Sequence, residues 1–145
     1  MKRRGFLSGM TVLAATIALT SGAAVAQSKD PIKIGCGMSL TGGLAANGKA
    51  AMIAINIWEE DVNAKGGLLG RPVKVTCLDD QTNPSTVPGI YSKLIDNDKV
   101  DLIISGYGTN LIAPAMPLAM QRNLLFMGLF GLDVNEKFKY DRYFQ

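Results

Sequence analysis

The stretch Val100-Asp101-Leu102-Ile103-Ile104-Ser105-Gly106-Tyr107-Gly108-Thr109-Asn110 contains the parts of a strand–turn–helix unit. The apolar run ending at Ile104 predicts a short buried strand, and residues 111–121 predict a helix. Between them, two glycines allow a tight turn and a close approach of the backbone to a ligand. We expect Thr109 to cap the helix, whose first N–H groups then form a site for an anion such as a carboxylate. The alternative is a capped turn that binds no ligand.

The same alternation of strand and helix extends through the chain from residue 32 onward. Apolar runs predict strands at residues 32–38, 73–78, 100–105 and 124–128, with a fifth beginning at residue 143, and helical periodicity predicts helices at 44–65, 85–97 and 111–121. Pro114 and Pro117 make the third helix irregular, and residues 130–139 are expected to form a loop. Crossovers through helices force the strands to pair in parallel. We therefore expect an α/β fold with a doubly wound parallel sheet.

Residues 1–26 have the features of a secretory signal peptide. Lys2-Arg3-Arg4 is its basic region, the apolar core runs from Met10 to Leu19, and Ala24-Val25-Ala26 is a small-residue cleavage site. The apolar core is too short for a comfortable membrane span. Arg3-Arg4 also resembles the twin-arginine signal, so export by either the general secretory or the twin-arginine route is open.

The composition excludes several functions for the part of the chain that follows the leader. The chain has 145 residues, of which 48% are apolar, which suits one folded domain. Its net charge of +3 comes from the three basic residues of the leader, so the mature chain is neutral and lacks the basic surface that binds nucleic acid. The sequence has no histidine, which removes the usual catalytic triad and the commonest metal ligand. We expect no catalytic residues, no metal and no cofactor.

Cys36 and Cys77 are the only cysteines. An exported chain can pair them in a disulfide. Each lies within a predicted strand, however, where a free cysteine behaves as a small apolar residue. We favour two buried thiols over a disulfide.

Other familiar motifs are incomplete in this sequence. Residues 35–40 and 106–111 each begin like the glycine fingerprint of dinucleotide-binding proteins, but a leucine takes the place of the third glycine in both. Asp79 and Asp80 are adjacent, so in a strand their side chains point in opposite directions and make a poor acid–base pair. We expect both carboxylates to belong to a turn. The turns at residues 39–43, 79–84, 105–110 and 128–133 all follow strands, and such a rim of strand ends binds small molecules.

Three stretches resemble the periplasmic substrate-binding proteins of ABC importers, in the branched-chain amino acid class with the type I periplasmic binding fold. The first is Met38-Ser39-Leu40-Thr41-Gly42 with Gly48 after it. The second and most specific is Val62-Asn63-Ala64-Lys65-Gly66-Gly67-Leu68-Leu69-Gly70-Arg71-Pro72-Val73, followed by Asp79-Asp80. The third runs from Ser105 through Pro114-Ala115. The resemblance implies that residues 27–145 are an incomplete N-terminal ligand-binding lobe, with the second lobe absent.

The resemblance also implies a set of binding residues. Thr109 falls where the family places a hydroxyl residue that binds the α-carboxylate of the ligand, and Tyr107, Gly108 and Asn110 flank it. Asn47 falls where amino acid binders often have an aromatic residue. After the fourth strand, the places of a small residue and a threonine hold Phe130 and Leu132. This departure favours a ligand with an apolar or aromatic body over a small polar amino acid.

The resulting hypothesis is a monomeric solute receptor in the periplasm that delivers an amino acid or organic acid to an ABC permease in the inner membrane. A sensor domain on the same fold is the second hypothesis, and an exported α/β enzyme is the third. The absence of histidine and of a phosphate-binding loop argues against the enzyme.

The leader gives a first testable prediction. We expect the mature protein to begin at or near Gln27, because the small residues of Ala24-Val25-Ala26 suit signal peptidase. Mass spectrometry of the exported protein measures the N-terminus directly. A mature product that retains residues 1–26 would contradict the prediction.

Overall fold

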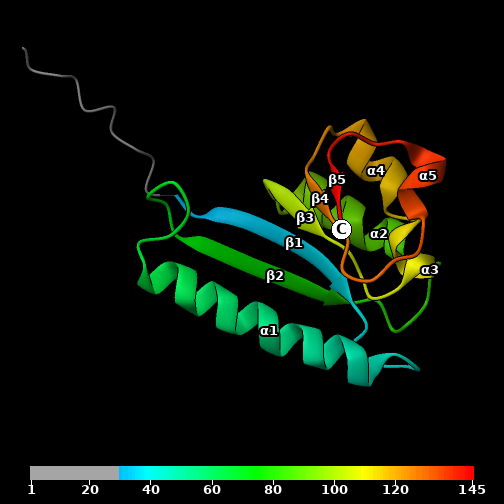
Figure 1. Cartoon of the computed structure of the whole chain (residues 1–145), viewed down its shortest axis with the longest axis horizontal. Coiled ribbons are helices and arrows are strands. Elements are labelled where there is room, and N and C mark those ends of the chain that lie inside the picture. The colour runs from blue at the N-terminus through cyan, green and yellow to red at the C-terminus, as the bar shows by residue number, and fades with distance from the viewer. Residues whose placement is uncertain (1–29) are drawn as a thin grey trace, which may run out of the picture.

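The computed structural model describes residues 30–145, so the predicted leader lies outside the described part of the chain. Five strands form one sheet in the order β2-β1-β3-β4-β5, and all four neighbouring pairs are parallel (Figure 1). The strands are β1 (Ile32–Met38), β2 (Val73–Asp79), β3 (Leu102–Ile104), β4 (Phe126–Met127) and β5 (Tyr143–Phe144). The predicted parallel α/β sheet is therefore confirmed, with the fifth strand where the sequence indicated it.

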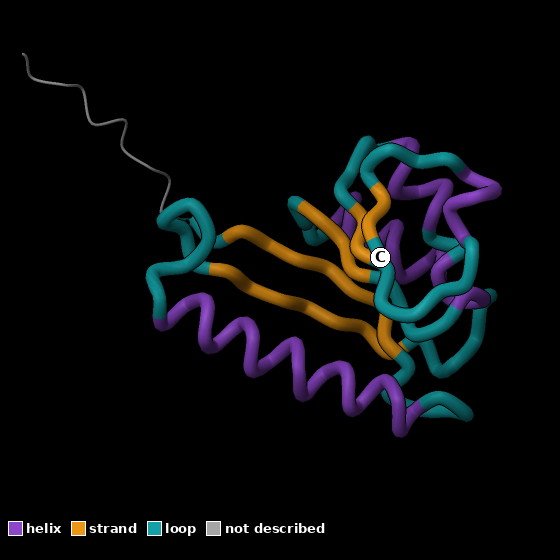
Figure 2. Tube along the Cα trace, in the orientation of Figure 1, coloured by secondary structure: helices purple, strands orange, loops and turns teal. Residues whose placement is uncertain are grey.

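Helices cover the two faces of this sheet unequally. The helical segments are α1 (Ala45–Ala64), α2 (Val87–Ser92), the π-helix η1 (Lys93–Asn97), α3 (Thr109–Ile112), α4 (Met116–Gln121) and α5 (Val134–Phe138). The long helix α1 runs beside β1 and β2 on one face, whereas the shorter helices gather on the other side of the sheet (Figures 1 and 2). This leaves the α1 face of β3 and β4 without a helix over it among the described residues.

The main hydrophobic core lies between the sheet and the short helices. Tyr91, Ile103, Met116 and Phe126 are fully buried there. The Tyr91 hydroxyl accepts a hydrogen bond from the Gly37 N–H at 3.1 Å and donates to the Ile104 carbonyl at 2.6 Å, so this side chain links α2 to two strands. Burial raises the pKa of Tyr91, which keeps the phenol neutral and able to donate.

One expectation about the helices needs revision, and another is confirmed. The predicted loop at 130–139 contains α5, a helix of five residues that is anchored by the buried Val134 and bounded by left-handed residues at Asp133 and Lys139. One helical turn is too short to produce a detectable hydrophobic period. The third helix is irregular, as its prolines predicted, and is split into α3 and α4.

The expectation of two free thiols is wrong, because Cys36 and Cys77 form a disulfide. The parallel register pairs these two residues directly across β1 and β2, with their Cα atoms 4.4 Å apart. Both side chains point to the same face of the sheet at that register position. The sequence placed each cysteine in a strand but did not specify the register that brings them together.

We predict that the exported protein has no titratable thiol under denaturing conditions and two after reduction. The cysteines are 41 residues apart in sequence, and a loop of that size stabilises a fold by about 2–4 kcal/mol through the unfolded state. Reduction, or the Cys36→Ala/Cys77→Ala double variant, should lower the free energy of unfolding in urea by that amount. Two free thiols in the unreduced protein would contradict the prediction.

Candidate functional site

The candidate site is the rim formed by the turns that follow β1, β2, β3 and β4. Because these strands are parallel, their carboxyl ends lie at one edge of the sheet. The rim comprises residues 39–44, 79–83, 105–110 and 128–133. All the residues that the resemblance assigns to ligand binding lie in it, except Asn47, which lies in the first turn of α1 just after it.

Asp79 holds the turn after β1 in place. Its Oδ1 accepts hydrogen bonds from the N–H groups of Leu40 at 2.9 Å, Thr41 at 3.1 Å and Gln81 at 2.9 Å. Its Oδ2 accepts from the Thr41 hydroxyl at 2.7 Å. Burial alone would raise the pKa of Asp79, but these hydrogen bonds to the carboxylate outweigh it and hold the pKa below its ordinary value of 3.8.

Asp80 joins three turns from a fully buried position. Its Oδ1 accepts from the Ser39 hydroxyl at 2.7 Å and from the Thr82 N–H at 2.8 Å. Its Oδ2 faces Gly106 and has no hydrogen-bond partner among the described residues. A Cβ atom at Gly106 would lie 2.9 Å from that oxygen, so glycine is required for this close approach. Both aspartates therefore hold turns, which agrees with their predicted place in a turn.

Thr109 does not cap its helix, contrary to the prediction. Gly108, with φ of 105°, is the capping residue, and Thr109 is the first residue of α3. The Thr109 Oγ1 instead accepts a hydrogen bond from the Leu132 N–H at 2.9 Å, which ties the turn after β3 to the turn after β4. Because α3 has only four residues, its helix dipole contributes little to anion binding.

Two aromatic rings also pack against each other across the two turns that Thr109 and Leu132 join. The rings of Tyr107 and Phe130 are stacked, with centroids 5.2 Å apart and planes inclined by 11°. Phe130 is 58% exposed, so much of its ring faces solvent. The Ser105 hydroxyl, which accepts from the Leu129 N–H at 2.9 Å, supports this pairing of turns. The sequence analysis did not include Ser105 among the site residues, although a hydroxyl group at the end of a strand could have indicated that it supports the following turn.

The structure thus brings four of the seven predicted residues into direct contact in two pairs, Thr109 with Leu132 and Tyr107 with Phe130. Gly108 and Asn110 lie in the same turn, with the Asn110 Oδ1 close to Gly108. Asn47 is exposed and makes no hydrogen bond to the other six among the described residues.

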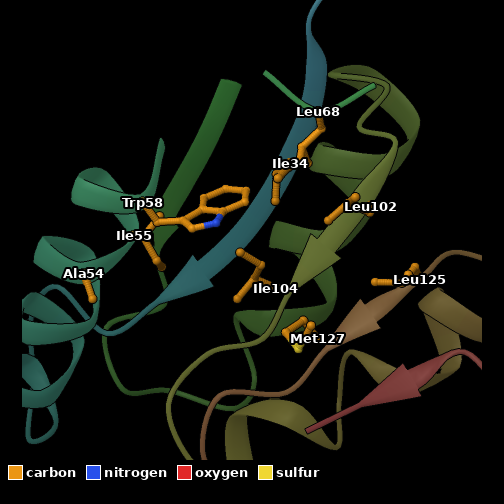
Figure 3. A pocket seen from close by; sticks show the side chains of 9 residues that line it. All are labelled: Ile34, Ala54, Ile55, Trp58, Leu68, Leu102, Ile104, Leu125 and Met127. Atoms are coloured by element: carbon orange, nitrogen blue, oxygen red, sulfur yellow. The ribbon is translucent and has the colours of Figure 1, made fainter. Parts of the chain in front are cut away.

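An apolar cavity lies away from the rim. This groove, which we call the α1 groove, has a volume of about 430 Å³ and runs between α1 and strands β1, β3 and β4 (Figure 3). It is lined by Ile34, Ala54, Ile55, Trp58, Leu68, Leu102, Ile104, Leu125 and Met127. In Figure 3 the Trp58 indole extends from α1 toward the strand side chains. The Trp58 side chain thus packs at the groove.

Residues 30–145 contain no cluster of three or more histidine, cysteine or acidic side chains that could hold a metal ion. None of the helices in this range is long and apolar enough to cross a membrane.

With the fold and the rim established, the comparisons with known proteins identify the class. Residues 31–145 match the model of the periplasmic binding protein family, and the chain belongs to that family. The fold is that of type I periplasmic binding proteins. It is similar to LivJ, the branched-chain amino acid transporter substrate-binding protein of Streptococcus pneumoniae, with a TM-score of 0.74 at 22% identity over 79% of this chain and 33% of that one.

Two further relatives carry functional descriptions. A solute-binding protein of an ABC transporter from Rhodopseudomonas palustris BisB5, solved in complex with 3,4-dihydroxybenzoic acid, is 28% identical with a TM-score of 0.69 and covers 77% of this chain and 31% of that one. An amino acid binding protein of Pseudomonas aeruginosa is 27% identical over 84 residues, 58% of this chain and 22% of the relative. The chain therefore spans at most about a third of the length of these relatives.

The hydrogen bonds of Asp79 predict a dependence of stability on pH. Because the pKa of Asp79 is lower in the folded than in the unfolded state, its stabilisation is complete above pH 3.8 and is lost as the pH falls through the folded value. We expect Asp79→Asn to lower the free energy of unfolding by about 1 kcal/mol at pH 7 and by less in strong acid. Urea unfolding followed by the fluorescence of Trp58, the single tryptophan, measures this.

Asp141→Asn is the matched control, because Asp141 is exposed and makes no hydrogen bond or ion pair in the described part of the chain. An equal loss of stability in both variants, or a loss in Asp79→Asn that does not change with pH, would contradict the role of Asp79.

Proposed function

We propose that this protein is the extracytoplasmic solute-binding component of an ABC importer, which captures a small carboxylate-bearing ligand with an apolar or aromatic body and delivers it to a membrane permease without catalysing a reaction. The observation that carries the proposal is the Thr109 hydroxyl, which is fixed by Leu132 in the same two turns that hold the stacked rings of Tyr107 and Phe130. Membership in the periplasmic binding protein family and the ABC transporter relatives support the role in import.

The carboxylate half of the proposal follows from the orientation of one hydroxyl. A threonine hydroxyl has one proton to donate and two lone pairs to accept with. Because the Thr109 Oγ1 already accepts from the Leu132 N–H, and the hydroxyl donates to no acceptor within residues 30–145, its proton is available to a ligand. The N–H groups of Leu111 and Ile112 donate to the Gly108 carbonyl, whereas those of Thr109 and Asn110 donate to no acceptor within residues 30–145. A hydrogen bond of this kind to a charged group is worth about 1.5–3 kcal/mol.

The aromatic half rests on the two rings. Tyr107 occupies one face of the Phe130 ring, and the 58% exposure of Phe130 leaves surface on which a further planar ring can stack. Such an aromatic contact adds roughly 0.5–1.5 kcal/mol beyond the burial of area. The relative from Rhodopseudomonas palustris binds 3,4-dihydroxybenzoic acid, a ligand that combines a carboxylate with a ring. We extend that ligand class, an aromatic acid, to this chain.

The α1 groove is a poorer candidate for this ligand. Its nine lining side chains are apolar, apart from the Trp58 indole nitrogen, and include no group that could pair with a carboxylate. It also lies on a face of the sheet, whereas ligands of open parallel α/β sheets bind beyond the carboxyl ends of the strands. The groove is the part of the sheet face that α1 does not reach.

The test uses the full-length protein, isothermal titration calorimetry and a panel of benzoic acids, aliphatic amino acids and the matching amides. We expect the aromatic acids to bind most tightly. Thr109→Ala should weaken binding of the acids by about tenfold or more and binding of the amides much less, whereas Thr109→Ser should retain binding. Phe130→Ala should weaken the aromatic acids selectively.

Thr76→Ala is the matched control, since Thr76 carries an exposed hydroxyl on β2 away from the rim. The proposed pocket is wrong if glycine binds as tightly as the aromatic acids, or if Thr109→Ala and Thr76→Ala leave every affinity equally unchanged. Turnover of a bound solute by the wild-type protein would contradict the non-enzymatic role.

A further inference from the structure

The peptide group between Gly131 and Leu132 is hydrogen-bonded on both sides. Its N–H donates to the Thr109 Oγ1 at 2.9 Å, and its carbonyl accepts a hydrogen bond from the Gln145 Nε2. Gln145 follows β5, whose carboxyl end lies at the same edge of the sheet as the rim (Figure 1). One planar peptide unit therefore connects Gln145 with the hydroxyl that the proposed function assigns to the ligand carboxylate.

Tyr143 sets the orientation of the Gln145 amide. The Tyr143 hydroxyl donates to the Gln145 Oε1 at 2.9 Å. A backbone carbonyl can only accept, so the amide nitrogen of Gln145 has to face Gly131 and the amide oxygen has to face Tyr143. Burial raises the pKa of Tyr143, which keeps the phenol protonated and able to donate. The Tyr143 ring is 8% exposed and packs edge-on against Phe126, with centroids 5.6 Å apart, which fixes the place of its hydroxyl.

Close packing keeps the turn after β4 within reach of these side chains. Gly128 and Gly131 are both buried. A Cβ atom at Gly128 would overlap the Tyr143 hydroxyl, and one at Gly131 would lie 2.7 Å from the Ile112 Cδ1 and 3.0 Å from the Val134 Cγ2. Only glycine at these two positions lets the backbone of the turn come this close to β5 and its neighbours.

The hydrogen bonds all run in one direction. The Tyr143 hydroxyl donates to the Gln145 amide, and that amide donates to the carbonyl of the peptide group between Gly131 and Leu132. The peptide N–H donates in turn to the Thr109 hydroxyl oxygen. In such a chain each group is polarised by the bond it accepts and donates more strongly, by roughly 10–30% per bond. The chain ends on the Thr109 proton, which has no acceptor within residues 30–145.

We propose that Gln145 is a positioning residue of the ligand site. It orients and polarises the Thr109 hydroxyl through the peptide group between Gly131 and Leu132, and so strengthens the hydrogen bond from that hydroxyl to a carboxylate. The inference rests on the proposed function, because it takes the Thr109 hydroxyl as the donor to the carboxylate. Gln145 itself does not need to touch the ligand.

The turn after β4 has a second support that does not involve Gln145. The Leu129 N–H donates to the Ser105 Oγ at 2.9 Å, next to Phe130 in sequence. Loss of the Gln145 amide should therefore change the donor strength of Thr109 more than the place of the Phe130 ring. An effect on acids that is absent for amides separates this role from a general loss of the site.

Calorimetric titration of the full-length protein with 3,4-dihydroxybenzoic acid and its amide tests the proposal. Gln145→Met keeps the length of the side chain but removes its hydrogen bonds, and should weaken the acid by about fivefold and the amide by less than about twofold. Tyr143→Phe keeps the ring and should weaken the acid by about twofold. Gln121→Met is the matched control, since Gln121 is exposed at the end of α4 and its side chain makes no hydrogen bond in the described part of the chain.

A double-mutant cycle shows whether Gln145 acts through Thr109. In the Thr109→Ala background, Gln145→Met should change the affinity for the acid by less than about twofold. Additive losses, or equal losses for acid and amide, overturn the role of Gln145 and leave the proposed function standing if Thr109→Ala alone weakens the acid. A Thr109→Ala variant that binds the acid as wild type does contradicts the proposed function and, with it, the role of Gln145 in binding.

Amide hydrogen exchange in the ligand-free protein tests the positioning without any ligand. The Leu132 N–H should exchange about tenfold faster in Gln145→Met than in wild type, because the peptide group loses the bond that orients it toward Thr109. Gln121→Met should leave this exchange rate unchanged. A Leu132 exchange rate that Gln145→Met does not alter overturns the proposal, whether or not an acid binds.

Discussion

The carboxylates of Asp79 and Asp80 at the end of β2 determine where the turns of the rim lie. Asp79 accepts three hydrogen bonds that fix the turn after β1 and a fourth from Gln81 in its own turn. Asp80 bonds Ser39 and Thr82 and comes so close to Gly106 that it also limits the turn after β3. Because a parallel sheet aligns strands but leaves the following turns free, these two side chains supply the constraint that backbone pairing cannot.

Two further hydrogen bonds join the turn after β4 to the turn after β3. Ser105 and Thr109, in the turn after β3, accept the N–H groups of Leu129 and Leu132, in the turn after β4. The positions of Tyr107 and Phe130 follow from these bonds, since each ring projects from a turn whose backbone is held. Side chains held by such supporting hydrogen bonds keep a binding geometry better than side chains on free loops.

The sequence predicted the fold better than the site, and the reason is physical. Strands β1 and β2 and helix α1 have long apolar patterns, and their predicted bounds agree with the structure to within a residue. The disulfide depended on the register between β1 and β2, which no local pattern encodes. Helix α5 was too short to be periodic, and the left-handed conformation of Gly108 moved the cap from Thr109 by one residue.

That displacement changes how the rim can recognise a carboxylate. A capping threonine uses one lone pair of its hydroxyl oxygen as an acceptor for its own helix, which fixes the side chain against that helix. Because Gly108 is the capping residue instead, the Thr109 oxygen makes no bond to its own helix and accepts from the Leu132 N–H. The hydroxyl donates to no acceptor within residues 30–145, so its proton remains available to a ligand. A hydrogen bond from this hydroxyl is stronger to a charged carboxylate oxygen than to the neutral carbonyl oxygen of an amide. The proposed selectivity of the rim for acids therefore depends on a backbone conformation that only glycine adopts readily.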